Sequence, residues 1–255
     1  MMARLIAVSV ILSLFTVFPA LAQPIAYIGS NNTNEVSIID VPSNRVVSSF
    51  QMSPGTKVNS MAVSPDSRFI YFNGNVVTAI DTSDSSIAAQ VDIGTGLSNG
   101  IDVTPDGKFL YSVSSVTDTL TVIRTSDFTI TNTISLGQGP DGVSFTPDGK
   151  AAYIADQVEN SVYVVDTASV AVTVIIPIPG GSLVRNIRVA PNGKFVYVSS
   201  VGGNIVTVID TATNTVTDTI TAGDSPRNIA FTPYSALSRK EPKPEVTSSY
   251  PLALK

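Results

Sequence analysis

The chain has 255 residues, of which 43% are hydrophobic and 14% charged, and its formal net charge is −5. This composition supports a folded core and excludes nucleic acid as a favoured partner, because basic residues are not in excess. The sequence contains no histidine, cysteine or tryptophan. Catalysis by histidine or thiol groups, disulfides and the usual ligands of haem and zinc are therefore excluded, and we expect no cofactor.

The first 22 residues have the organisation of a cleavable signal peptide. Arg4 supplies a positive charge, residues 5–18 form an apolar stretch, and residues 20–22 provide small residues for cleavage before Gln23. The alternative is an uncleaved anchor, but the stretch is shorter than the roughly 20 residues that span a bilayer. We predict an exported protein, periplasmic, extracellular or at the cell surface, with no integral membrane segment after cleavage.

A turn of the Pro-Asp-Gly type recurs along the rest of the chain. Its copies, 40–44 residues apart and degenerate in the last case, begin at Pro65, Pro105, Pro147, Pro191 and Pro233. A tyrosine stands six residues after each of the first four prolines, and a β-branched run follows it. Self-similarity at a fixed period indicates a repeat architecture.

Each repeat contains four short segments that favour β-strands. In one repeat these segments are residues 141–146, 151–155, 161–166 and 172–177, which together are rich in Val, Ile, Thr and Tyr. Four-stranded units of this length, repeated radially, predict an all-β fold, a β-propeller of four-stranded blades. The repeat domain spans residues 23–233. Residues 234–255 depart from the pattern and are predicted to be a disordered or aberrant tail.

The repeat resembles the YVTN-type β-propeller repeat family, which includes exported and surface-layer-like proteins. The tetrad of this family is matched loosely at residues 27–30, 153–156 and 197–200, and residues 207–216 follow its consensus closely. The resemblance implies a seven-bladed ring, of which this chain would be a truncated part. The five visible repeats also permit a closed five-blade ring, in which residues 227–232 pair with the first strand and hide its edge.

The positions just before the innermost strand of each repeat are the candidate binding residues. Because repeats hold the backbone constant, different side chains at an equivalent position can encode selectivity. Five residues, six positions before the repeat prolines, are expected at one mouth of the central channel: Asn59, Asn99, Asp141, Arg185 and Arg227. Their arginines could hold a small anion or a peptide carboxylate. The alternative is a solvated rim of compensating charges.

The predicted function is that of a non-catalytic binding or surface-interaction module, whose partner is an unknown protein, peptide or small anionic ligand. The aspartates of the turns and strand ends are interpreted as turn formers, and the repeated tyrosines as packing between blades. The enzymatic alternative is a lactonase-like hydrolase, because lactonase-type propellers resemble this fold and use carboxylate and amide ligands for a divalent ion. We predict no catalytic or metal-binding residue, and a third possibility is a fragment of a larger propeller.

Overall fold

A computed structural model describes residues 25–30, 35–52, 58, 60–74, 76–94 and 98–231. The predicted signal peptide and the tail after Pro233 lie outside these residues. The described residues contain nineteen β-strands. Within them, no helix is long and apolar enough to cross a membrane. The chain divides into two compact units, residues 1–59 and 60–255.

The strands form five antiparallel sheets, which we call blades 1 to 5. Blade 1, in the first unit, has three strands: β1 (Ile25–Gly29), β2 (Glu35–Asp40) and β3 (Arg45–Gln51). The other four blades belong to the second unit and have four strands each. Blade 2 consists of β4 (Ser60–Val63), β5 (Phe69–Asn73), β6 (Val76–Asp81) and β7 (Ser86–Asp92). Blade 3 consists of β8 (Ser98–Val103), β9 (Phe109–Ser114), β10 (Thr119–Arg124) and β11 (Thr129–Ser135). Blade 4 consists of β12 (Pro140–Phe145), β13 (Ala151–Asp156), β14 (Ser161–Asp166) and β15 (Ala171–Pro177). Blade 5 consists of β16 (Val184–Val189), β17 (Phe195–Ser200), β18 (Ile205–Asp210) and β19 (Thr215–Thr221).

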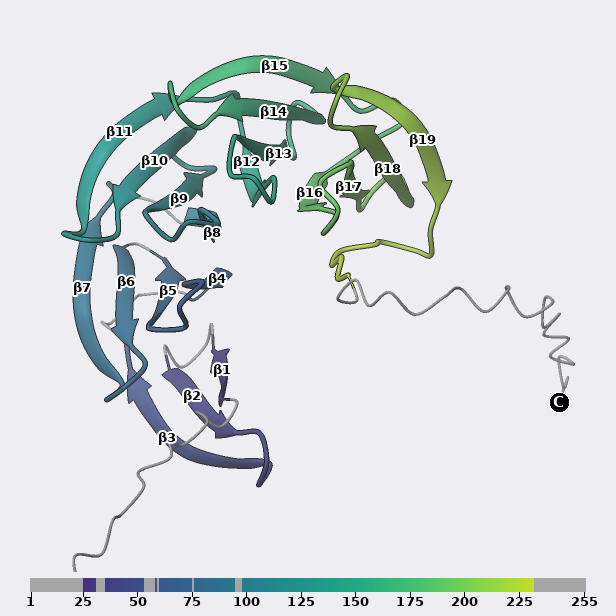
Figure 1. Cartoon of the computed structure of the whole chain (residues 1–255). Helices are drawn as coiled ribbons and strands as arrows, with labels where there is room; N and C mark the ends of the chain where they lie inside the picture. Colours follow the sequence, from purple (N-terminus) through teal and green to yellow (C-terminus); the bar gives the residue numbers. More distant parts are fainter. Residues whose placement is uncertain are drawn as a thin grey trace, which may run out of the picture. The chain divides into compact units, whose positions relative to one another are not determined.

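The blades of the second unit are arranged radially. Their first strands contact one another in succession, β4 with β8, β8 with β12 and β12 with β16. Within this unit these strands lie on the inner side, while β7, β11, β15 and β19 form the outer rim (Figure 1). This arrangement is that of a β-propeller, so the predicted fold class is confirmed.

The turn between the first two strands of a blade is stabilised by the aspartate and glycine of the Pro-Asp-Gly motif. In blade 4, Asp148 Oδ1 accepts hydrogen bonds from Thr146 Oγ1 (2.7 Å) and from the backbone N–H of Lys150 (3.1 Å). Gly149 follows with a φ of 71°, which glycine adopts without strain. In the other repeats, the backbone N–H two residues later donates in the same way to the side-chain oxygen of Asp66, Asp106 or Asn192. These residues are turn formers, as predicted.

The aspartates that end the third strands also stabilise turns. Asp166 Oδ1 accepts the N–H of Ser169 at 2.8 Å and its hydroxyl at 2.6 Å. The same role is filled by Asp40, Asp81 and Asp210. Arg124 breaks the series and instead binds Asp127, with 2.9 Å between Nη1 and Oδ2. These contacts confirm the interpretation of the strand-end carboxylates as structural.

The core consists of apolar clusters between consecutive blades. Tyr71, Tyr111 and Tyr153 are each 1% exposed, and they belong to the clusters of blades 2–3, 3–4 and 4–5 respectively. The ring of Tyr111 meets that of Phe145 in the next blade edge to face, with 4.8 Å between centroids. The repeated tyrosines therefore pack between blades, as predicted.

The predicted strand at residues 227–232 is absent from its described part, and its predicted pairing with the first strand, which would join the two compact units, stays a prediction. Within the first unit β1 pairs with β2, and within the second unit residues 227–231 are not part of any strand. These residues pack against blade 5 instead, because the N–H of Ile229 donates to Asn186 Oδ1 (3.3 Å) and the hydroxyl of Ser199 donates to the carbonyl of Arg227 (3.0 Å). Blade 1 has three strands in the described part of the chain.

Candidate binding site at the inner strands

Four of the five predicted binding residues lie on the inner side of the second unit. Asn99 is in β8, Asp141 in β12 and Arg185 in β16, and Arg227 is in the segment after β19. Asn59 lies outside the described residues. The four described positions are equivalent in successive repeats, which places their side chains on consecutive inner segments.

Two of these residues contact each other. Arg185 Nε lies 3.8 Å from Asp141 Oδ2, and both side chains are half-buried. Burial raises the pKa of Asp141, although the positive charge of Arg185 opposes this effect. Asn99 is directed elsewhere, because its Nδ2 donates to Ser115 Oγ at 2.6 Å within its own blade. The predicted rim is therefore an Asp-Arg pair rather than a ring of five converging groups among the described residues.

Three arginines lie on the last inner segments of the second unit, Arg185 among them. Arg188, also in β16, is exposed and donates from Nη1 to the carbonyl of Ile187 at 3.3 Å. Arg227 is exposed as well. The Nε of Arg185 is buried and has no hydrogen-bond acceptor in the described structure. Blade 5 and the segment after it therefore present three guanidinium groups, which we call the arginine group.

Asp102 of β8 is the most strongly perturbed carboxyl of the inner strands. Burial raises its pKa to about 6, while hydrogen bonding from the N–H of Val103 (2.9 Å) and the charge of Arg188 act in the opposite direction. A carboxyl with such a pKa is ionised at neutral pH and exchanges protons near it.

Asp102 and Arg188 were not among the predicted site residues because they stand at a different position of the inner strand. The position three residues before each repeat proline also varies in charge, and its residues are Ala62, Asp102, Ser144, Arg188 and Ala230. In blade 4 the side chain at this position contacts the next blade, because Ser144 Oγ accepts a hydrogen bond from the N–H of Val189 at 3.2 Å. A comparison of repeats at every offset would have found the pair.

Comparison with known proteins assigns the chain to a family. Residues 100–237 match the model described as "Lactonase, 7-bladed beta-propeller", and this segment is more than half of the chain. The chain belongs to this Lactonase family. The matched residues include blades 3 to 5 and therefore the inner-strand positions described above. The finer resemblance to the YVTN repeat remains a sequence-based prediction.

Solved structures support the Lactonase-family fold. The chain is similar to hydrazine synthase of Kuenenia stuttgartiensis, with 26% identity and a TM-score of 0.60 over 66% of this chain. It spans about half of that protein, 49% of its length. A protein of unknown function from Desulfotomaculum acetoxidans DSM 771 is 17% identical, with a TM-score of 0.71 over 79% of this chain and 67% of its own. No curated protein sequence matches significantly.

The carboxylates of the inner strands do not fit the divalent ion that lactonase-type propellers use. Asp141 is paired with Arg185, and Asp102 is subject to the positive charge of Arg188. No group of three or more His, Cys, Asp or Glu residues that could hold a metal occurs among the described residues. Because Ca²⁺ requires six to eight oxygen ligands, these carboxylates act as partners of arginine and not as a metal site.

Proposed function

We propose that the protein is an exported, non-catalytic propeller that binds a small carboxylate-bearing molecule at its inner strands. The observation that carries this proposal is the arginine group of Arg185, Arg188 and Arg227 on adjacent inner segments. Planar guanidinium groups bind carboxylates through paired, charge-assisted hydrogen bonds. Two carboxylates interact with this group, Asp141 with Arg185 and Asp102 with Arg188, so the three positive charges are only partly compensated.

The proposal predicts that Arg188→Gln weakens carboxylate binding. Hydrogen bonds to charged groups contribute about 1.5–3 kcal/mol, so the affinity for lactate or gluconate should fall by about tenfold or more. Isothermal titration of the purified chain with both compounds measures the change. Lys194→Gln is the matched control, because it removes one exposed positive charge from the same blade at the turn before β17.

Two results would contradict the proposal. One is a wild-type chain that binds neither carboxylate. The other is an equal loss of affinity in Arg188→Gln and Lys194→Gln, which would show a response to net charge and not to a site.

A second candidate function is lactonase-like hydrolysis, which the family match favours. With its pKa raised to about 6 by burial, Asp102 suits the role of a general base that takes a proton from water as this water attacks a lactone carbonyl. The ring C–O bond then breaks, and Asp102 returns the proton to the alkoxide that leaves. Arg188, whose charge acts on Asp102, suits the carboxylate that ring opening produces. This mechanism uses only side chains of the protein and does not require a divalent ion.

If the protein is such a hydrolase, its rate should rise with pH through about 6, because the base acts only when deprotonated. Asp102→Asn should lower the rate by about 100-fold or more. Titration of the acid released from a simple lactone, with a buffer blank at every pH, measures both effects. Asp148→Asn is the control, since Asn192 fills the same turn position in the next repeat. Turnover that persists in Asp102→Asn removes this residue from the mechanism.

A further inference from the structure

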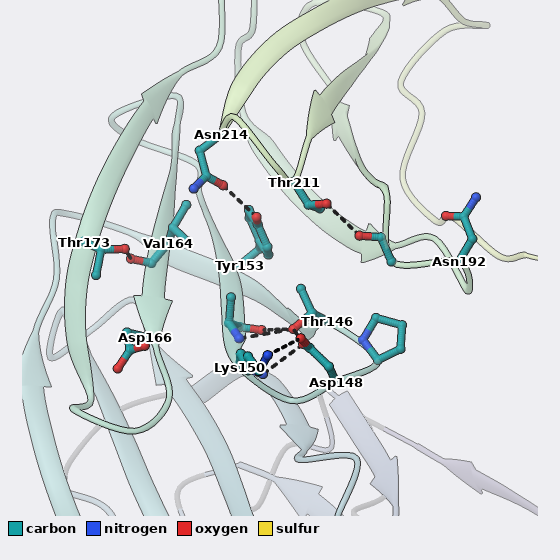
Figure 2. A pocket seen from close by; sticks show the side chains of 13 residues that line it. Thr146, Asp148, Lys150, Tyr153, Val164, Asp166, Thr173, Asn192, Thr211 and Asn214 are labelled. Atoms are coloured by element: carbon teal, nitrogen blue, oxygen red, sulfur yellow. Dashed lines mark hydrogen bonds and ion pairs between the residues drawn. The ribbon is translucent and has the colours of Figure 1, made fainter.

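A cavity lies between blades 4 and 5, beside the Pro-Asp-Gly turns. Its volume is about 530 Å³, and its walls include Asp148, Ala151, Tyr153, Asp166 and Asn214. Figure 2 shows Tyr153 and Asn214 meeting across this pocket, with Asp148 and Lys150 below them. None of these residues belongs to the inner-strand site.

One wall of the pocket is open because an aromatic residue is missing from the repeat. The position four residues after the repeat proline is occupied by Phe69, Phe109, Ala151 and Phe195. Phe69 and Phe109 pack against the apolar clusters of blades 2–3 and 3–4. Ala151 begins β13 at the same place, so blade 4 lacks a phenyl ring where the other three four-stranded blades have one.

The opposite wall is formed at a position that varies between repeats. The last residue of the loop between the third and fourth strands is Ser85 in blade 2, Phe128 in blade 3, Val170 in blade 4 and Asn214 in blade 5. The ring of Phe128 meets that of Phe69 across blades 2 and 3, with 5.8 Å between centroids, and the pocket there is only about 250 Å³. In blades 4 and 5, alanine and asparagine replace this pair, which accounts for the larger cavity.

The polar groups of the pocket are only partly used within the protein. The hydroxyl of Tyr153 donates to Asn214 Oδ1 at 2.7 Å, whereas Asn214 Nδ2 makes no hydrogen bond in the described structure. Asp148 is paired with Lys150 at 3.5 Å. Asp166 forms no ion pair with any described residue, and hydrogen bonds from Ser169 lower its pKa, so its carboxylate is charged at neutral pH.

We propose that this pocket binds a single-ring aromatic amine. The ring takes the place that phenylalanine occupies in the other blades, where Ala151 leaves room for it. A hydroxyl on the ring accepts a hydrogen bond from Asn214 Nδ2, and the ammonium group lies against the carboxylate of Asp166. Phenolic amines therefore fit better than aromatic acids of the same size, which the Asp166 charge repels.

The test is titration of the purified chain with tyramine, followed by calorimetry and by the rise in melting temperature. Ala151→Phe restores the repeat residue and fills the pocket, so its affinity for tyramine should be at least tenfold lower while the chain still folds. Asp166→Asn, which keeps a side-chain oxygen for the turn, should lower the affinity severalfold. Ala88→Phe adds the same ring to an exposed position of β7 and should bind as the wild type does.

The outcomes separate this site from the inner-strand site. Phenylacetate, if it binds, should respond to Arg188→Gln and not to Ala151→Phe. The proposal is overturned if the wild type does not bind tyramine at millimolar concentration, or if Ala151→Phe binds it unchanged. If Ala151→Phe does not fold, unchanged binding in Asp166→Asn overturns the proposal equally.

Discussion

Replacing Tyr111 by alanine is expected to lower the free energy of unfolding by about 3–5 kcal/mol, the range for truncating a buried aromatic residue. Tyr111 is 1% exposed and lies between blades 3 and 4, where its ring meets Phe145. The variant loses both the transfer free energy of the ring and its contacts across the two blades. Urea denaturation followed by circular dichroism measures the change from the shift in midpoint.

Tyr197→Ala is the matched control for this prediction. Tyr197 occupies the same repeat position in blade 5 but is only half-buried, and its ring meets Phe231 of the segment after β19 at 5.3 Å. Its truncation should therefore cost less than that of Tyr111. Equal losses for the two variants would show that packing between four-stranded blades is not what makes Tyr111 important.

The strands could be predicted closely because their limits are set by local turn chemistry. In the fourth blade the predicted segments 141–146 and 161–166 correspond to β12 (Pro140–Phe145) and β14 (Ser161–Asp166). The turn at Pro147 and the strand-end Asp166 each make their hydrogen bonds within a few residues. Residue types that act locally give a pattern that can be recognised in a single sequence.

The packing of residues 227–231 within the second unit could not be predicted because it depends on distant parts of the chain. Their composition favours a strand, but Asn186 and Ser199 bind the backbone of Ile229 and Arg227, and a pattern of residue types does not show this competition. The same limit applies to Asn99. Its repeat position was known, whereas its hydrogen bond to Ser115 depends on a side-chain conformation.

The two candidate functions at the inner strands share a chemical requirement. Hydrolysis of a lactone yields a hydroxycarboxylate, so a hydrolase of this type would also bind the anions proposed for a non-catalytic propeller. A substitution of Asp102 distinguishes the two functions, because its carboxylate would act as the base in hydrolysis but would repel an anion bound by a non-catalytic propeller. Carboxylate binding that is kept or strengthened in Asp102→Asn, without any lactone turnover in the wild type, would favour the binding module.

Gly100→Ala is expected to destabilise the chain by about 1–3 kcal/mol, the range for forcing extra volume into a packed interior. A Cβ at this position of β8 would overlap the backbone carbonyl oxygen of Asp141 in β12 and lie 3.0 Å from Val113 Cγ2. The equivalent Gly142 faces the carbonyl of Arg185 in β16, 2.6 Å from where its Cβ would be. Glycine at this position thus permits the close approach of successive inner strands. An added Cβ would meet a backbone carbonyl, which cannot move aside as the end of a flexible side chain can.

The matched control for this substitution is Gly223→Ala, because a Cβ at Gly223 would meet no atom within 4 Å. Both variants add one methyl group in place of the same residue type, and thermal melts of the two compare the cost directly. The melting temperature should fall in Gly100→Ala and change little in Gly223→Ala. Similar melting temperatures in both variants would mean that β8 and β12 can move apart without loss, and that the inner-strand contacts do not hold blades 3 and 4 together.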